Sequence, residues 1–164
     1  MNIRLLIETY MGRTVLIALF LALIGPFLIV VIDKRKPLRK IHKYVLLIAY
    51  AVVIFFLTLL DRDSGETSAI YLTPFWTYSN LNVSALRWQI YLNVLLFVPF
   101  GFLVPFSTKA GLLKTLGIAA ALSAVIEMCQ YVFSLGLCEI DDLIHNTIGG
   151  ALGYVYWRLI KRVK

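Results

Sequence analysis

Charged residues are scarce in this chain of 164 residues: they make up 15% of it, while 60% of the residues are hydrophobic and the mean hydropathy is +0.84. Soluble domains carry about 25% charged residues, so this composition excludes a typical soluble globular protein. Cysteine is also rare. Cys129 and Cys138 are too few for a disulfide framework or a four-ligand zinc site. The chain has no HExxH motif, nucleophile elbow or glycine-rich phosphate loop, so no familiar catalytic class is indicated.

The hydrophobic residues are gathered into long runs, each about as long as the roughly 17 to 25 residues that cross a bilayer as a helix. Such runs lie at 14–32, 44–60, 90–106, 112–133 and 141–160. We therefore predict an all-α fold, a polytopic transmembrane helical bundle with about five membrane spans, which forms a single domain over residues 1–164.

Three other segments are less apolar. Residues 1–13 carry a helical apolar stripe, which favours a short surface helix. Residues 33–43 contain six Lys or Arg and a proline, which predicts a loop outside the bilayer. Residues 61–89 mix charges with Tyr and Trp, which predicts a loop that is partly interfacial or re-entrant.

The basic residues indicate the orientation. With five alternating spans, twelve Lys and Arg fall on one side and four on the other. The richer side should be cytoplasmic, which puts the N-terminus outside and the C-terminus inside. The net charge of +7 therefore reads as an orientation signal, and we expect membrane lipids rather than nucleic acid as partners.

Polar residues within the predicted spans fall on single helical faces. One face of 112–133 carries Ser123, Glu127 and Gln130, one face of 141–160 carries Asp142, Asn146, Gly149 and Gly153, and one face of 90–106 carries Asn93, Phe97 and Gly101 around Pro99. At about 1.5 Å per residue, the predicted orientation puts Asn93, Glu127, Asp142 and Asn146 at one depth near the outer surface. We expect a polar recess there, with an aromatic rim formed by Tyr71, Trp76, Trp88, Tyr91 and Tyr131.

Simpler roles are open for several of these residues. Asn93, Gln130 and Asn146 can hydrogen-bond between helices, at about 0.6 kcal/mol each. A buried Glu127 needs a donor or cationic partner, which favours a functional role. Asp141 suits an N-cap, which leaves Asp142 for the site.

The remaining motif residues also have structural interpretations. His145 permits a metal-binding face with Glu127, although a hydrogen-bonded histidine is the more common case, and we expect no metal and no cofactor. Gly149 and Gly153 indicate a close helix contact. Pro74 and Pro99 are typical of a loop turn and a helix kink.

Three strings, YLTPF (71–75), NVLLFVPFGFLVPF (93–106) and IEMCQYVFSLGLCEIDDLIHNTIGGALGY (126–154), together resemble the VanZ-like family of small bacterial membrane proteins. The resemblance covers residues 71–154, and the family's motif positions match at Pro74, Asn93, Pro99, Gly101, Glu127, Gln130, Asp142, Asn146, Gly149 and Gly153. Glu139 stands where the family often has Asp, and His145 is not part of the family pattern. The resemblance implies a multi-pass protein of the bacterial cell membrane associated with resistance to glycopeptide antibiotics, teicoplanin and its lipid-tailed relatives in particular. It brings no established catalytic activity.

Three hypotheses follow. The leading one is a binding protein whose outward recess, made by Asn93, Glu127, Gln130, Asp142 and Asn146, engages a lipid-linked cell-wall precursor or a lipoglycopeptide. The second is an intramembrane hydrolase or transferase with Glu127 and Asp142 as acid and base or as metal ligands. The third is a transporter, a homo-oligomer joined through Gly149 and Gly153.

Overall fold

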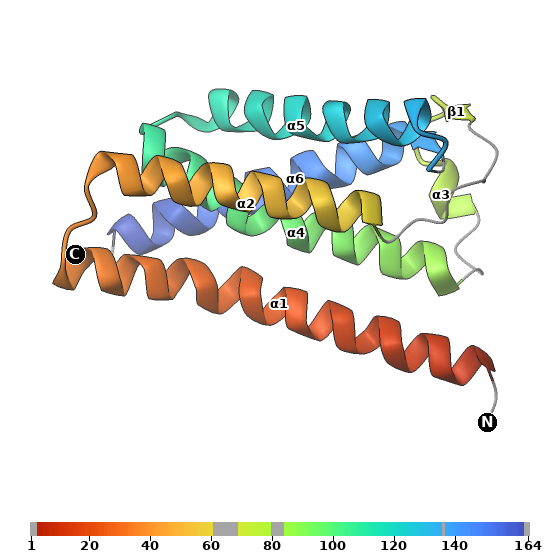
Figure 1. Cartoon of the computed structure of the whole chain (residues 1–164), viewed down its shortest axis with the longest axis horizontal. Coiled ribbons are helices and arrows are strands. Elements are labelled where there is room, and N and C mark those ends of the chain that lie inside the picture. Colours follow the sequence, from red (N-terminus) through yellow and green to blue (C-terminus); the bar gives the residue numbers. More distant parts are fainter. Residues whose placement is uncertain (1–2, 61–68, 80–83, 136, 163–164) are drawn as a thin grey trace.

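Five long helices that alternate in direction form the body of the computed structural model (Figure 1). The structure describes residues 3–60, 69–79, 84–135 and 137–162. The long helices are α1 (Ile3–Arg35), α2 (Lys40–Leu60), α4 (Ser84–Thr108), α5 (Leu112–Val132) and α6 (Ile140–Arg162). The short elements are β1 (Ile70–Tyr71), α3 (Trp76–Ser79) and β2 (Cys138–Glu139).

The all-α helical bundle predicted from the apolar runs is confirmed, because each run lies within a helix apart from one terminal residue. The predicted boundaries were too narrow. Residues 3–13 are not a separate surface helix, since α1 continues through them without a break. The 33–43 loop shrinks to residues 36–39, because the lysines and arginines on either side extend the helices beyond the apolar runs.

The predicted 61–89 loop also needs correction. Its last residues, from Ser84 on, already belong to α4, and its middle contains β1 and α3. Helical hydrogen bonding in α4 therefore starts before the charges end, a boundary that hydropathy does not mark. The charged stretch 61–66, the part most typical of an interfacial loop, lies outside the described residues.

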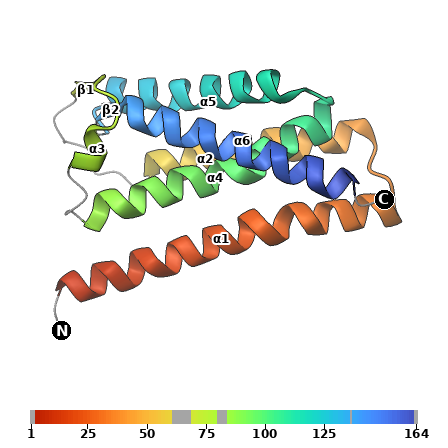
Figure 2. The same ribbon diagram turned by 180° about the vertical axis from the view of Figure 1, so that it is seen from behind.

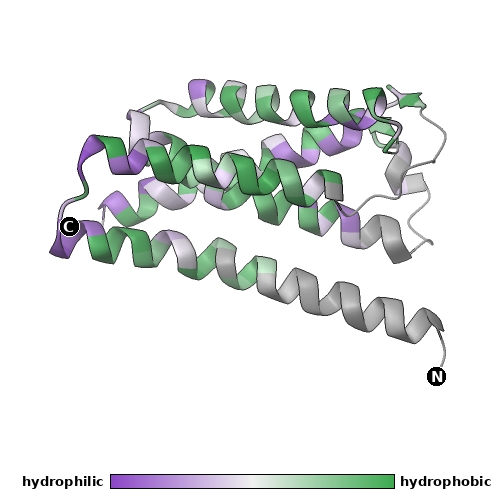
Figure 3. Ribbon diagram, viewed as in Figure 1, coloured by the Kyte–Doolittle hydropathy of each residue, from purple (hydrophilic) through white to green (hydrophobic). Residues whose placement is uncertain are grey.

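Three of the helices in the described part of the chain, α2, α4 and α5, are long and apolar enough to cross a membrane. Helix α6 is not among them, and it carries Asp141 and Asp142 in its first turn and Lys161 and Arg162 in its last. The predicted number of about five spans stays a prediction. Figure 3 shows that α2 is hydrophobic along most of its length and hydrophilic at its beginning, next to the hydrophilic end of α1.

Helix α4 is the central helix of the bundle, since α1, α2, α5 and α6 all pack against it. Its segment 97–105 is buried along its whole length. Phe97, Phe100 and Val104 from α4 join Ile54 of α2 and Ile126 of α5 in the hydrophobic core.

Helices α4 and α6 approach each other through glycine. A Cβ on Gly149 would lie 2.9 Å from the Cβ of Phe97, and one on Gly153 would lie 2.6 Å from the amide nitrogen of Phe102. Gly101 faces Gly150 in the same way, with the Gly150 Cα 2.6 Å from a Cβ built there. The residue numbers of the contacting positions increase along both helices, so α4 and α6 run in the same direction, as alternate helices of a bundle should.

The close helix contact expected of Gly149 and Gly153 thus lies inside the chain. Both glycines are buried against α4, so they cannot also form the dimer contact suggested for a transporter. Small residues in a membrane helix allow close backbone packing, and here α4 of the same chain takes that surface.

Pro99 does not break α4, which continues through Pro99 and Pro105 to Thr108. Proline removes one amide donor from a helix, and neighbouring side chains often satisfy the carbonyls around it. Here the hydroxyl of Tyr50 on α2 donates to the carbonyl oxygen of Leu96, at 3.0 Å. The bond ties α2 to α4 one turn before the proline.

The two ends of the bundle differ (Figure 2). We call one the polar end: it holds β1, α3, β2, the beginnings of α4 and α6 and the end of α5. The other is the basic end, where α1 and α2 are joined and α4 and α6 finish. The charge count predicts that the polar end faces outside and the basic end faces the cytoplasm.

Replacing Gly149 by Ala should lower the stability of the protein by about 1 to 3 kcal/mol, because the new methyl group meets the backbone of Val94 and the Phe97 side chain. Gly117→Ala is the matched control, since a Cβ there has nothing within 4 Å. Unfolding of the purified protein in mixed detergent micelles measures both. Equal stability of the Gly149 variant and the wild type would contradict the close packing.

Candidate functional site

The connection between α5 and α6 is held by a buried carboxylate. Oε2 of Glu127 accepts a hydrogen bond from the backbone N–H of Glu139, at 2.9 Å. Both side chains are buried, at 4% exposure each. Glu139 belongs to β2, which pairs in parallel with β1 in the register Ile70 to Cys138 and Tyr71 to Glu139. Glu127 therefore fixes the place where the segment after α2 meets the beginning of α6.

Asp141 binds a distant turn, which corrects its prediction as an N-cap. Helix α6 begins at Ile140, so Asp141 lies within the first turn, and its Oδ1 accepts from the backbone N–H of Phe75, at 2.6 Å. Phe75 has a φ of 65°, a left-handed conformation that costs a non-glycine residue roughly 1 to 2 kcal/mol. The turn at Pro74 thus presents an amide that Asp141 holds.

Asp142 faces α4 instead. The side-chain amide of Gln89 donates to both of its carboxylate oxygens, at 3.2 and 3.0 Å. Asp142 is 4% exposed. The two neighbouring aspartates therefore fasten α6 to two different segments, one to the turn before α3 and one to α4.

Two of the predicted amides make the interhelical hydrogen bonds that were their simpler interpretation. Nδ2 of Asn146 donates to the hydroxyl of Ser123 on α5, at 2.8 Å. Nε2 of Gln130 donates to the carbonyl oxygen of Thr58, at 3.2 Å, near the end of α2. The last carbonyls of a helix lack partners within it, so Gln130 satisfies one of them.

His145 is hydrogen-bonded, again as its simpler interpretation held. Its Nε2 lies 2.9 Å from the hydroxyl of Tyr78, and the residue is buried. No group of three or more His, Cys, Asp or Glu side chains in the described ranges is arranged to hold a metal ion.

Several buried polar atoms at this end have no hydrogen-bond partner within the described part of the protein. They are Nδ2 of Asn93, Oε1 of Gln130, Nδ1 of His145 and Oδ1 of Asn146. A buried polar atom without a partner costs about 1 to 3 kcal/mol, so such atoms call for an explanation in a bound molecule or water. They come from α4, α5 and α6.

Aromatic side chains surround this end. Tyr71 stacks on Trp76 with ring centroids 4.9 Å apart, and Trp88 meets Tyr91 edge to face at 5.9 Å. Tyr71, Tyr91 and Tyr131 are exposed, while Trp76 and Trp88 are half-buried. Leu72 and Phe75 are also exposed, at 70% and 61%. We call these exposed and half-buried side chains at the polar end the apolar rim, and their predicted place around the polar groups stays a prediction.

The structure brings the predicted residues to one region. Asp142 and Asn146 bond to α4 and α5 from the first two turns of α6, and Glu127 bonds to Glu139 just before α6 begins. Asn93 precedes Val94, whose backbone lies against Gly149 of α6. Their assignment as ligand-binding residues stays a prediction. Phe97, Gly101, Gly149 and Gly153 are packing residues.

Sequence reasoning missed Gln89, Tyr78 and the role of Asp141. Gln89 falls within the predicted 61–89 loop, although it lies one helical turn before Asn93 and shares its face, which is a signal in the sequence. Tyr78 and the Phe75 amide reach α6 across more than sixty residues of sequence, and no local pattern reveals such contacts.

The apolar helices and their glycine-mediated packing define an all-α membrane protein. Residues 43–161 match the family described as VanZ/LLP1. Over 122 residues the chain is 32% identical to Protein VanZ of Enterococcus faecium, and the alignment covers 70% of this chain and 72% of that protein. The chain therefore belongs to the VanZ-like family, and the match begins earlier than the sequence strings suggested, within α2. No solved structure matches it.

The bond between Ser123 and Asn146 should show as a coupling energy. We expect the variants Ser123→Ala and Asn146→Ala to couple by about 0.6 kcal/mol, and by no more than about 2, in a double-mutant cycle of unfolding. Thr147→Val combined with Ser123→Ala is the control and should show no coupling, since the Thr147 hydroxyl donates to Leu143 in its own helix. Additive effects in the first cycle would rule the bond out.

The thiol of Cys138 reports on the carboxylates around it. Burial raises its pKa, and the charges of Glu127, Asp142 and Glu139 raise it further. In a Cys129→Ser background, Cys138 should react with a maleimide more slowly at pH 8 than a free thiol does, because less of it is thiolate.

Glu127→Gln should speed that reaction at the same pH, because removal of the negative charge lowers the thiol's pKa. Asp33→Asn, at the basic end, should leave the rate unchanged. If Glu127→Gln has no effect on the labelling rate, then Glu127 carries no charge near this thiol.

Proposed function

We propose that this protein is a multi-pass protein of the bacterial cell membrane that protects against glycopeptide antibiotics of the teicoplanin type, by binding a molecule at its polar end. The ligand class is a lipid-linked cell-wall precursor or the lipoglycopeptide itself, both of which join a polar head of sugars and amides to an acyl chain. Membership of the VanZ-like family supports the link to resistance.

The observation that carries the proposal is the set of buried polar atoms on α4, α5 and α6 that have no hydrogen-bond partner among the described residues. Nδ2 of Asn93 is a donor, while Oε1 of Gln130 and Oδ1 of Asn146 are acceptors, so together they suit a ligand that both donates and accepts hydrogen bonds. Sugar hydroxyls and peptide amides do this. A few placed polar groups in a largely apolar setting are typical of small-molecule sites.

The apolar rim supports the same ligand class. Leu72, Phe75 and Tyr131 are exposed beside the polar groups, and Tyr71 offers the face of a stacked pair. Aromatic side chains with polar tips are favoured where an apolar chain meets water, as at the head of a lipid. A ligand with an acyl chain would lay that chain against the rim.

Binding is favoured over catalysis because the two carboxylates assigned to acid and base chemistry hold the fold. Glu127 accepts from the backbone of Glu139, and Asp142 accepts twice from Gln89. Truncating either side chain to alanine should therefore disturb the geometry of the polar end as well as its charge.

Cells that express Asn93→Ala together with Gln130→Leu should lose most of the teicoplanin protection given by the wild-type protein at equal expression, because two of the polar atoms offered to the ligand are gone. Susceptibility and the retention of labelled teicoplanin by the cells measure the effect. Protection equal to the wild type would refute binding at this site.

Thr147→Val is the matched control, since it removes a hydroxyl at the same end, one that donates to the Leu143 carbonyl within α6. Its protection should equal that of the wild type. A product analysis of the purified protein with lipid-linked precursors tests the enzymatic alternative, and turnover there would replace binding by catalysis.

A further inference from the structure

A cavity of about 280 Å³ lies at the basic end, between α1, α2, α4 and α6, at the opposite end of the bundle from the candidate site. Lysines from four different segments line it: Lys34, Lys43, Lys109 and Lys161. Among the described residues that line it, Asp33 is the one acidic residue. The fold therefore gathers positive charge that is dispersed over more than 120 residues of sequence.

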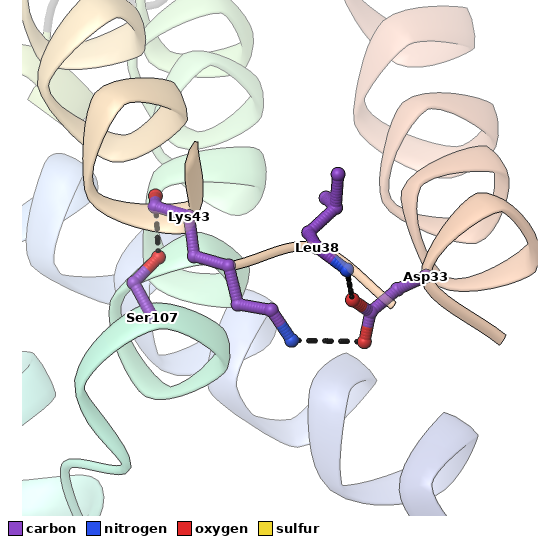
Figure 4. A network of polar contacts seen from close by, with 4 residues as sticks. All are labelled: Asp33, Leu38, Lys43 and Ser107. Atoms are coloured by element: carbon purple, nitrogen blue, oxygen red, sulfur yellow. Dashed lines mark hydrogen bonds and ion pairs between the residues drawn. The ribbon is translucent and has the colours of Figure 1, made fainter. Parts of the chain in front are cut away.

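Asp33 is already engaged (Figure 4). Its Oδ2 forms an ion pair with Nζ of Lys43, at 2.9 Å, and its Oδ1 accepts from the backbone N–H of Leu38, at 2.8 Å. The hydroxyl of Ser107 donates to the carbonyl oxygen of Lys43, at 2.8 Å, which fixes the beginning of α2 on α4. The carboxylate thus closes the loop between α1 and α2 and neutralises Lys43.

Lys109 and Lys161 keep the cavity wall positive. Neither has a carboxylate partner within the residues that the structure describes. Nζ of Lys161 lies 4.8 Å from the centroid of the Trp157 ring, and Nζ of Lys43 lies 4.3 Å from that of Phe106. Both rings line the cavity, so cation–π contacts hold ammonium groups at its wall.

Lysines at helix ends have a simpler role, because a cation stabilises the C-terminal end of a helix dipole. Lys34 and Lys161 sit in the last turns of α1 and α6 and meet that description. Lys109 directly follows the last residue of α4, in a left-handed conformation with a φ of 63°, and its charge also favours that helix end. The dipole does not require these lysines to share one cavity.

The walls indicate what kind of anion fits. Val30, Pro105 and Ile160 add apolar surface to the two aromatic rings, so the cavity has a cationic wall and an apolar wall. It lies where the candidate spans of α2 and α4 begin and end, at Lys40 and Thr108. Tryptophan and lysine at that level are typical of the zone where lipid headgroups lie. A volume near 280 Å³ holds a headgroup but not a drug-sized molecule.

We propose that this cavity binds the phosphate headgroup of an anionic phospholipid, with Lys109 and Lys161 on the phosphate and the Phe106 and Trp157 rings against the glycerol and the first part of the acyl chains. Basic pockets between membrane helices on the cytoplasmic side bind such headgroups. The site is separate from the polar end and does not depend on the function proposed there.

The test uses the purified full-length protein and native mass spectrometry with phosphatidylglycerol, phosphatidylcholine and inorganic phosphate as separate probes. The wild type should bind one phosphatidylglycerol in preference to phosphatidylcholine. K109Q/K161Q should weaken phosphatidylglycerol binding by roughly fivefold for each lysine removed. K36Q/K40Q is the control: it removes the same charge from the same end, neither residue lines the cavity, and its affinity should stay within twofold of the wild type.

Three outcomes would overturn the proposal. These are equal losses in the two double variants, equal affinity for the two lipids, and saturation by inorganic phosphate that displaces the lipid at similar concentration. Because K161Q also removes a contact with Trp157, the single variant K109Q, which leaves both ring contacts in place, provides a second measurement and should lose about fivefold.

Discussion

The close approach of α4 and α6 is the constraint on which the rest of the structure depends. Glycine at 101, 149 and 153 lets the two backbones touch, and no hydrophobic side chain of ordinary size fits between them. In a membrane, where burial of apolar groups gives little driving force, such backbone contact and van der Waals packing hold helices together. Because the two helices run in the same direction, their beginnings lie side by side. The polar end is built on that adjacency.

The first two turns of α6 bond to several of the elements that lie beside them. Asp142 bonds to Gln89 on α4, Asn146 bonds to Ser123 on α5, and His145 bonds to Tyr78 on α3. Each bond ties α6 to a different neighbour, so this short stretch of helix organises the end of the bundle. The carboxylate of Glu127 completes it from α5 by holding the strand that leads into α6.

Much of this fold was readable from the sequence, because bilayer length and helical period are strong constraints. The runs of apolar residues predicted all the long helices, and the spacing of Ser123, Glu127 and Gln130 placed one face of α5 correctly toward its neighbours. The boundaries failed where polar residues continue a helix, as at Lys40 and Ser84, because hydropathy records the bilayer and not the hydrogen bonding. The sequence could not predict the pairing of β1 with β2 or the hydrogen bond from the Phe75 amide to Asp141, because both join segments far apart in the chain.

The turn at Phe75 has an evolutionary consequence. An aromatic residue in a left-handed backbone conformation is tolerated here with an acid sixty-six positions away to hold its amide. Substitution of one partner alone is therefore unfavourable. A shorter or neutral residue at 141 would leave the strained turn unsupported. A relaxed turn would leave a buried carboxylate without that donor. Homologous chains should therefore vary at these two places in concert, with glycine at 75 as the natural companion of a lost acid at 141.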